Sequence, residues 1–346
     1  MRYGIIIFAL LISTGLLRAQ SDYSSVYRFL TLPTSAYSAS LGGSPIASAD
    51  SNINLISVNP ALLNEKTHSQ MGLNFSNVSP GINMGMIAYG FDWAEKGSFG
   101  FGFQYLNYGQ MDAYDEFGAD MGTFSGGDYA LMASWSQLLL KDLRIGATVK
   151  GIYSKIDRYQ SLAAAFDAGL TYNNEEWLLT VSVVAKNIGS QIDEYIEGEN
   201  EPLPQDYQFG IAKGLPHAPF RFSVVAHHLH QTNLLIENQN TVTPNNTDLA
   251  PDELEIDYIN NQSEKIARHL IFGVEFLPSE KFTARVGYNY YRRSTMKMIE
   301  KGGMVGFSLG ASLLIKGIHV EYAYTANHLA GGINQLSIRT NPSRFF

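Results

Sequence analysis

Three histidines within a short span, His227, His228 and His230, form the densest group of histidines in this sequence and could act as metal ligands. In the alternating geometry of a strand, His228 and His230 point to the same face. Two imidazoles with this spacing can hold a transition metal, but a closed site needs about four ligands and no third ligand is evident. The group is therefore either part of a metal site or a set of ordinary polar residues at the end of a strand.

No catalytic residues can be assigned. The sequence contains no Gly-x-Ser-x-Gly elbow, no phosphate-binding loop and no His-Glu-x-x-His helix. It also contains no cysteine, which removes thiolate ligands, disulfides and thiol redox chemistry. A hydrolase built into a barrel wall would need a nucleophile, a base and an orienting group, and these cannot be named. We expect a non-enzymatic protein without a cofactor.

The acidic residues are concentrated in three stretches. Residues 109–128, 187–206 and 231–264 contain five, six and seven Asp or Glu residues and no Lys or Arg. Charge runs of this kind are often simply solvated. They would also suit the docking of a basic surface, or of a surface bridged through a divalent cation. The candidate partner-binding residues are Asp115, Glu116, Asp193, Glu194, Glu197, Glu199, Asp252, Glu253, Glu255 and Asp257.

The composition restricts the class of protein that can position these residues. Charged residues make up 16% of the 346, compared with about 25% in ordinary soluble domains. The 32 Gly, 20 Tyr and 19 Phe residues suit barrel strands and interfacial aromatic belts. The formal net charge of −8 argues against nucleic acid as a partner, because phosphate binding needs clustered Lys and Arg.

The N-terminal region divides into two segments. Residues 1–19 have the pattern of a signal peptide, with Arg2 before an apolar stretch, and we expect cleavage after Ala19. An uncleaved anchor helix is the alternative, although the apolar stretch is short for a membrane span. Residues 20–69 alternate weakly and carry their own apolar residues. We expect them to fold into a plug within the lumen of a barrel.

Residues 70–346 predict an all-β domain, a 14-stranded antiparallel transmembrane β-barrel. Alternation such as Phe101, Gly102, Phe103 places bulk toward lipid and small residues toward the interior. The final residue, Phe346, is consistent with the aromatic C-terminal signal of such barrels. We expect strands at residues 70–78, 83–93, 97–108, 126–140, 143–157, 161–173, 176–187, 205–214, 219–230, 265–277, 280–293, 301–315, 317–327 and 332–341.

The connections between these strands alternate in length. The even-numbered ones are short turns, such as residues 141–142 and 316–317, whereas the odd-numbered ones include residues 109–125, 188–204 and 231–264. Outer-membrane barrels have short periplasmic turns and long external loops. We therefore expect an integral protein of the outer membrane, with its long, acidic loops at the cell exterior.

Three passages resemble a known family. Residues 27–36 (Tyr-Arg-Phe-Leu-Thr-Leu-Pro-Thr-Ser-Ala), 39–43 (Ala-Ser-Leu-Gly-Gly) and 59–63 (Asn-Pro-Ala-Leu-Leu) resemble the start of PorQ-like outer-membrane proteins of the type IX secretion system in Bacteroidetes. The Leu-Gly-Gly and Asn-Pro-Ala elements also resemble those of PorV-type and, more distantly, FadL-type barrels. Family members often have Arg after the Ser-Ala pair. This chain has Tyr37 there, so a role of that Arg does not carry over.

The resemblance implies a plugged barrel with a tethering role. PorQ-like proteins hold a PorZ-type surface protein in an attachment complex with a PorU-type sortase and PorV. There, cargo bearing C-terminal sorting signals is processed and attached to anionic lipopolysaccharide. The alternative is a FadL-like transporter of hydrophobic small molecules. The turn Asn59, Pro60, Ala61 would gate such a channel, or else form a rigid turn that seats the plug.

Overall fold

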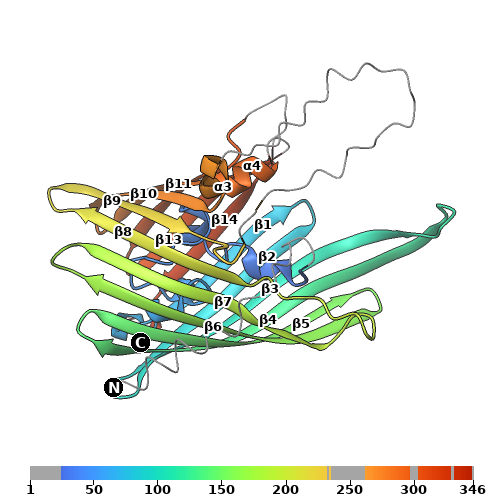
Figure 1. The fold of residues 1–346 in the computed structure, drawn as a ribbon, viewed down its shortest axis with the longest axis horizontal. Helices are drawn as coiled ribbons and strands as arrows, with labels where there is room; N and C mark the ends of the chain where they lie inside the picture. Colours follow the sequence, from blue (N-terminus) through green and yellow to red (C-terminus); the bar gives the residue numbers. More distant parts are fainter. Residues whose placement is uncertain (1–24, 232–233, 235–261, 297–302, 329–330, 345–346) are drawn as a thin grey trace.

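The computed structural model is a closed barrel in which every strand is antiparallel to its two neighbours (Figure 1). The structure describes residues 25–231, 234, 262–296, 303–328 and 331–344. Its fourteen strands are β1 (Met71–Ser79), β2 (Ile82–Trp93), β3 (Gly97–Tyr114), β4 (Asp120–Leu140), β5 (Leu143–Ile156), β6 (Tyr159–Asn174), β7 (Leu179–Asp193), β8 (Asp206–Leu215), β9 (Ala218–Ala226), β10 (Leu270–Ser279), β11 (Phe282–Asn289), β12 (Phe307–Ile315), β13 (Ile318–His328) and β14 (Gly331–Thr340). The predicted fourteen-stranded antiparallel barrel is confirmed.

Consecutive strands pair with each other, and β1 pairs with β14 to close the wall, with Met71 opposite Thr340. The described helices are short: α2 (Ala36–Ser40), α3 (Gln262–Arg268), α4 (Tyr290–Met296) and the 3₁₀ turns Arg28–Thr31, Ile53–Ser57, Pro60–Leu62, Glu65–Thr67 and Pro342–Arg344. Among the described residues, none of the helices has the length and apolarity that a membrane-spanning helix requires.

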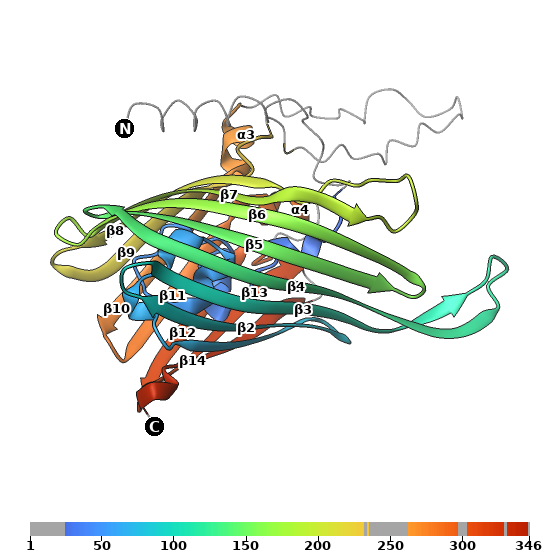
Figure 2. The same ribbon diagram turned by 90° about the horizontal axis from the view of Figure 1, so that it is seen from below.

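Residues 25–70, which we call the inner segment, lie inside the barrel (Figure 2). Helix α2 contacts β11 to β14, whereas the turn Pro60–Leu62 contacts β4, β5 and β6 across the lumen. The side chains of Ile53, Leu55 and Ile56 are almost completely buried. The apolar residues of the inner segment are thus covered by the inner face of the wall, where they are removed from water.

Several strand glycines allow the inner segment to touch the wall with its backbone. A Cβ atom on Gly146 of β5 would lie 2.4 Å from the carbonyl carbon of Pro60. A Cβ atom on Gly287 of β11 would lie 2.3 Å from the backbone nitrogen of Gly42. No side chain fits at these separations, so glycine is required for the close approach of two backbones.

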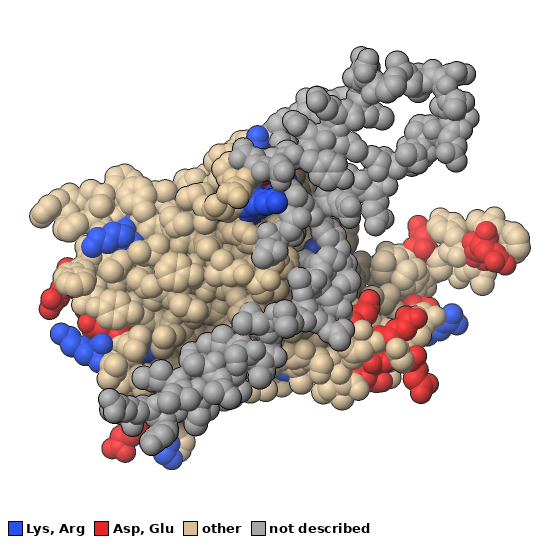
Figure 3. All heavy atoms as spheres, in the orientation of Figure 1, with Lys and Arg blue, Asp and Glu red and all other residues tan. Residues whose placement is uncertain are grey.

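The outer face of the wall is apolar. Figure 3 shows few charged side chains over the middle of the barrel. Alternate strand residues point inward, and many of these, such as Gln104 and Thr148, are polar and buried. This distribution is the reverse of that in a soluble protein and matches a barrel of the outer-membrane type in lipid. Each strand exposes at least one large apolar side chain: Leu73, Ile87, Phe101, Leu131, Val149, Phe166, Val183, Phe209, Phe222, Phe272, Val286, Leu309, Tyr322 and Leu336.

The two ends of the barrel differ. We call the end with the connections β3–β4, β7–β8 and β9–β10 the long-loop rim, and the end with turns such as residues 141–142 the short-turn rim. Part of the predicted connection 109–125 is itself paired, because β3 continues to Tyr114 and β4 begins at Asp120. These extensions pair only with each other, since β2 pairing stops at Asn107 and β5 pairing at Gly126. The hairpin therefore projects beyond the rest of the rim (Figure 1).

Several predicted strand boundaries near this rim are wrong. The strand expected at 176–187 continues to Asp193, and the one expected at 301–315 begins only at Phe307. The strand expected at 219–230 ends at Ala226, and the one expected at 280–293 ends at Asn289, where α4 begins. The strand expected at 265–277 begins only at Leu270, after α3. Helices α3 and α4 pack against each other at this point. This tertiary contact decides the secondary structure at this point, because the sequence pattern of a short segment can fit either a strand or a helix.

Candidate functional site

The tip of the β3–β4 hairpin exposes large apolar side chains beside acidic ones. The side chains of Tyr114, Phe117 and Met121 are 64%, 86% and 68% exposed. The carboxylate of Asp115 accepts the backbone N–H groups of Phe117 at 2.9 Å and Ala119 at 2.8 Å, which orders the turn. Large apolar side chains exposed together are typical of protein contact surfaces.

The described acidic candidates lie on the same rim. Asp115 and Glu116 are exposed on the hairpin turn, and Asp193 is exposed at the end of β7. Figure 3 shows acidic side chains gathered at this end of the molecule. In the β7–β8 connection, Glu197 and Glu199 are exposed and Glu194 is half-buried. Asp252, Glu253, Glu255 and Asp257 lie outside the described residues.

Two acids from the same sequence stretches are buried rather than exposed. Asp128 of β4 is 3% exposed and accepts hydrogen bonds from the hydroxyl groups of Tyr108, at 2.6 Å, and Ser154. Asp206 of β8 is also buried. Both residues lie at inward-facing positions of strands. The prediction that all acidic residues of these stretches belong to the loop surface is therefore wrong for Asp128 and Asp206.

A network of ion pairs fills part of the lumen. Glu275 of β10 forms an ion pair with Arg221, whose Nε lies 3.0 Å from Oε1, and it accepts a hydrogen bond from Arg285 Nε at 3.2 Å. Both terminal nitrogens of Arg221 donate to one oxygen of Asp50, at 3.0 Å and 2.9 Å. Asp50 belongs to the inner segment and the other residues belong to the wall. The network therefore ties the inner segment to β9, β10 and β11.

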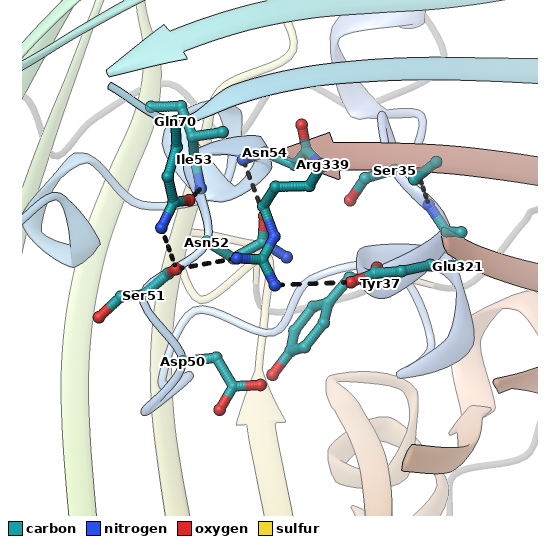
Figure 4. A network of polar contacts seen from close by, with 12 residues as sticks. Ser35, Tyr37, Asp50, Ser51, Asn52, Ile53, Asn54, Gln70, Glu321 and Arg339 are labelled. Atoms are coloured by element: carbon teal, nitrogen blue, oxygen red, sulfur yellow. Dashed lines mark hydrogen bonds and ion pairs between the residues drawn. The ribbon is translucent and has the colours of Figure 1, made fainter. Parts of the chain in front are cut away.

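Tyr37 occupies the centre of this network. Its hydroxyl donates to Glu275 Oε2 at 3.3 Å, and the guanidinium of Arg285 lies 4.2 Å from its ring centroid. This cation–π contact uses a charge supplied by the wall. Figure 4 shows the neighbouring contacts, in which Arg339 bonds the carbonyl of Ser51 at 3.5 Å and pairs with Glu321 at 4.0 Å.

The turn Asn59, Pro60, Ala61 is buried against β5 and β6. The Nδ2 group of Asn59 donates to the carbonyl of Ile46 at 2.8 Å and to Thr171 Oγ1 at 2.9 Å, and Oδ1 accepts the Ala61 N–H at 2.9 Å. Because the Asn59 side chain makes all of these hydrogen bonds, the contacts favour a rigid turn that holds the inner segment in place rather than a gate.

We expect Asn59→Ala to lower the free energy of unfolding by about 2–3 kcal/mol, because buried donors and acceptors lose their partners. Asn77→Ala is the matched control, since Asn77 bonds Asn83 at the exposed end of β1, at 3.0 Å. Its expected effect is within about 0.5 kcal/mol. Urea unfolding in lipid vesicles measures both changes, and equal effects would contradict the seating role.

The histidines are arranged differently from the prediction. Because β9 ends at Ala226, His228 and His230 do not share a strand face. His227 and His228 instead lie beside Asp206, and the His230 ring packs on Tyr207 with ring centroids 5.5 Å apart. Burial, followed by the charge of His228, lowers the pKa of His227 to about 3, so its imidazole is neutral at neutral pH.

Two cavities flank the packed interior. One, of about 370 Å³, lies at the long-loop rim and is lined by apolar residues such as Phe29 and by Asp206 and Arg292. The other, of about 850 Å³, lies at the short-turn rim and is lined by polar residues that include Glu65 and Arg144. The buried core of the inner segment, Ile53 to Ile56, lines neither cavity.

Comparisons with known proteins bear on the fold. No protein-family model and no curated sequence matches this chain. The solved toluene transporter TodX of Pseudomonas putida matches with a TM-score of 0.51 and 11% identity, over 89% of this chain and 96% of that one. A TodX monoaromatic hydrocarbon channel with a deltaS2 mutation matches with a TM-score of 0.54 and 10% identity, over 89% and 98% of the two chains. The chain thus shares the barrel fold of these channels.

Proposed function

We propose that this protein is a non-enzymatic anchor in the outer membrane, and that its long-loop rim holds a surface protein. The observation that carries the proposal is the projecting β3–β4 hairpin. Residues 112–120 contain four acidic residues, no basic residue and the exposed Phe117. A basic partner with an apolar pocket would match this tip in both charge and shape.

The resemblance to PorQ-like proteins suggests which kind of protein the partner is. It would be a PorZ-type surface protein, in a complex with a PorU-type sortase and PorV that attaches sorted cargo to lipopolysaccharide. The long-loop rim would then face the cell exterior. The fixed interior supports this role, because ion pairs from Arg221 to Asp50 and Glu275 hold the inner segment in place. A protein that anchors a partner needs a rigid interior of this kind, whereas a transporter needs an open path through the barrel.

A second candidate is transport of hydrophobic small molecules, and the fold comparison by itself favours it. The matching structures are described as a toluene transporter and a monoaromatic hydrocarbon channel. In this chain, the cavity at the long-loop rim is partly apolar, with Phe29, Leu106 and Ile333 among its lining residues. Transport would require the inner segment to move, since its core is packed against the wall.

The hairpin tip offers a direct test. The triple variant Asp115→Lys, Glu116→Lys, Phe117→Ser should reduce partner retention about tenfold or more, which corresponds to about 1.4 kcal/mol. The sequence Glu175, Glu176, Trp177 at the short-turn rim provides a matched control, with two acids followed by an aromatic residue that is 62% exposed. The same charge and size changes there should leave retention unchanged.

Retention is measured by gentle solubilisation of the outer membrane, affinity capture of the protein and mass spectrometry of what is bound. Capture of a large surface protein that the hairpin variant loses and the control variant keeps is the expected result. Equal retention by all three proteins would contradict the anchor at this surface. Bound hydrophobic small molecules without any protein partner would instead favour the transporter.

A further inference from the structure

We propose that Asp206, His227 and His228 form a binding site for a divalent transition metal such as Zn²⁺, at the long-loop rim of the lumen. The three residues come from the start of β8 and from the chain that follows β9. One ligand atom from each lies within 4.8 Å of the others. Two imidazoles and one carboxylate are a ligand set that suits Zn²⁺ and neighbouring first-row metals.

The spacing of the ligand atoms is close to that of a metal site. His228 Nδ1 lies 3.2 Å from Asp206 Oδ1. Tetrahedral zinc, with bonds of about 2.0–2.2 Å, places neighbouring ligand atoms about 3.3 Å apart. This pair therefore already has the required separation, and a ligand atom of His227 lies within 4.8 Å of both.

His227 carries a nitrogen that needs a partner. Its side chain is buried, with the residue 4% exposed, and its Nε2 atom has no hydrogen-bond partner among the described residues. An unpaired polar atom in the interior is costly and is seldom left without a reason. A metal ion bound at Nε2 would remove this cost.

The surrounding contacts orient the proposed ligands. Asp206 Oδ2 accepts from Gln208 Nε2 at 2.5 Å, and Oδ1 accepts the backbone N–H of His228 at 2.6 Å. His228 has a left-handed backbone, with φ of 54°, which is uncommon for residues other than glycine. Hydrogen bonds that fix a ligating carboxylate, and strain concentrated at one residue, are common at metal sites.

The charges around the cavity define the rest of the site. Lys186 and Arg292 line the same cavity as Asp206. These cations oppose a bare metal ion, but they would stabilise an anion bound to it. With three protein ligands, an open position remains on the metal. We therefore expect the fourth ligand to be anionic, such as hydroxide or a carboxylate.

The test uses the full, untagged chain in detergent after removal of metals with EDTA. Titration with Zn²⁺ should show one ion per chain by calorimetry and by elemental analysis. Co²⁺ should give the visible absorption bands of a tetrahedral site. Zn²⁺ should also raise the melting temperature, since it binds only the folded protein.

Variants separate this site from adventitious binding. Asp206→Asn should weaken Zn²⁺ binding about tenfold or more, consistent with the loss of one ligand, and the double variant His227→Ala, His228→Ala should abolish it. His217→Ala, at an exposed position of the short-turn rim, is the control and should bind normally. Electrophoretic heat-modifiability establishes that each variant is folded. If the double variant does not fold, Asp206→Asn and the Co²⁺ spectrum of the native protein still decide the matter. Substoichiometric binding, or equal affinity in Asp206→Asn and the native protein, would overturn the proposal.

Discussion

Replacing Glu275 with glutamine is expected to lower the free energy of unfolding by about 3–5 kcal/mol, the usual cost of removing one partner from a buried ion pair. Glu275 is 3% exposed and bridges Arg221 and Arg285. The substitution keeps the shape of the side chain and removes its charge. Arg221 would then keep its hydrogen bonds to the carboxylate of Asp50, whereas Arg285 would lose the carboxylate to which its Nε donates.

Chemical denaturation in lipid vesicles, followed by tryptophan fluorescence, gives the free energy of unfolding. Glu280→Gln is the matched control, because Glu280 lies exposed in the next turn of the chain. Its expected effect is within about 0.5 kcal/mol. If Glu275→Gln were no more destabilising than the control, the charges of the lumen would have to be hydrated rather than mutually paired.

Replacing Gly146 with valine is expected to displace the inner segment. The first atom of the new side chain would lie 2.4 Å from the backbone nitrogen of Ala61 and from the carbonyl carbon of Pro60. Backbone cannot yield as a flexible side chain can, so the turn Asn59, Pro60, Ala61 must leave its seat. An overpacking cost of about 1–3 kcal/mol would raise the population with a displaced segment about fivefold to 160-fold.

Ion conductance across planar lipid bilayers measures this displacement, because the lumen opens when the inner segment leaves it. Gly151→Val is the control on the same strand. Gly151 is exposed on the outer face, and a Cβ atom there would meet nothing within 4 Å. Conductance should rise for Gly146→Val alone. A large conductance in the unmodified protein would contradict a filled lumen and would favour the transporter.

Much of the fold follows from local chemistry that can be read in order along the chain. The alternation of Phe101 and Phe103 with Gly102 places bulk on one face of β3, and Leu131 and Val149 repeat the pattern on β4 and β5. Lipid offers no hydrogen bonds to the backbone, so alternating segments without spanning helices must close on themselves. The number of strands and the difference between the two rims could therefore be predicted.

The boundaries at the long-loop rim could not be predicted in the same way. The paired extension of β3 and β4 continues beyond the point where β2 and β5 stop pairing, and it carries acidic residues such as Asp112, opposite Thr123, which are typical of a loop. Helix α4 replaces the end of a strand because it packs on α3, a contact between residues distant in sequence. A contact between residues distant in sequence leaves no pattern in the local sequence from which it could be predicted.

The same distinction applies to the candidate sites, where the sequence shows the residue types but not which residues meet in space. Sequence alone indicated an acidic rim and a group of histidines, because charge and residue type are properties of each residue. It could not pair His227 and His228 with Asp206, which is separated from His228 by 22 residues and by the β8–β9 hairpin. Nor could it join Asp50 to Arg221 across 171 residues. Closure of the barrel around the inner segment brings these groups together, since only the folded wall sets which inward-facing side chains meet.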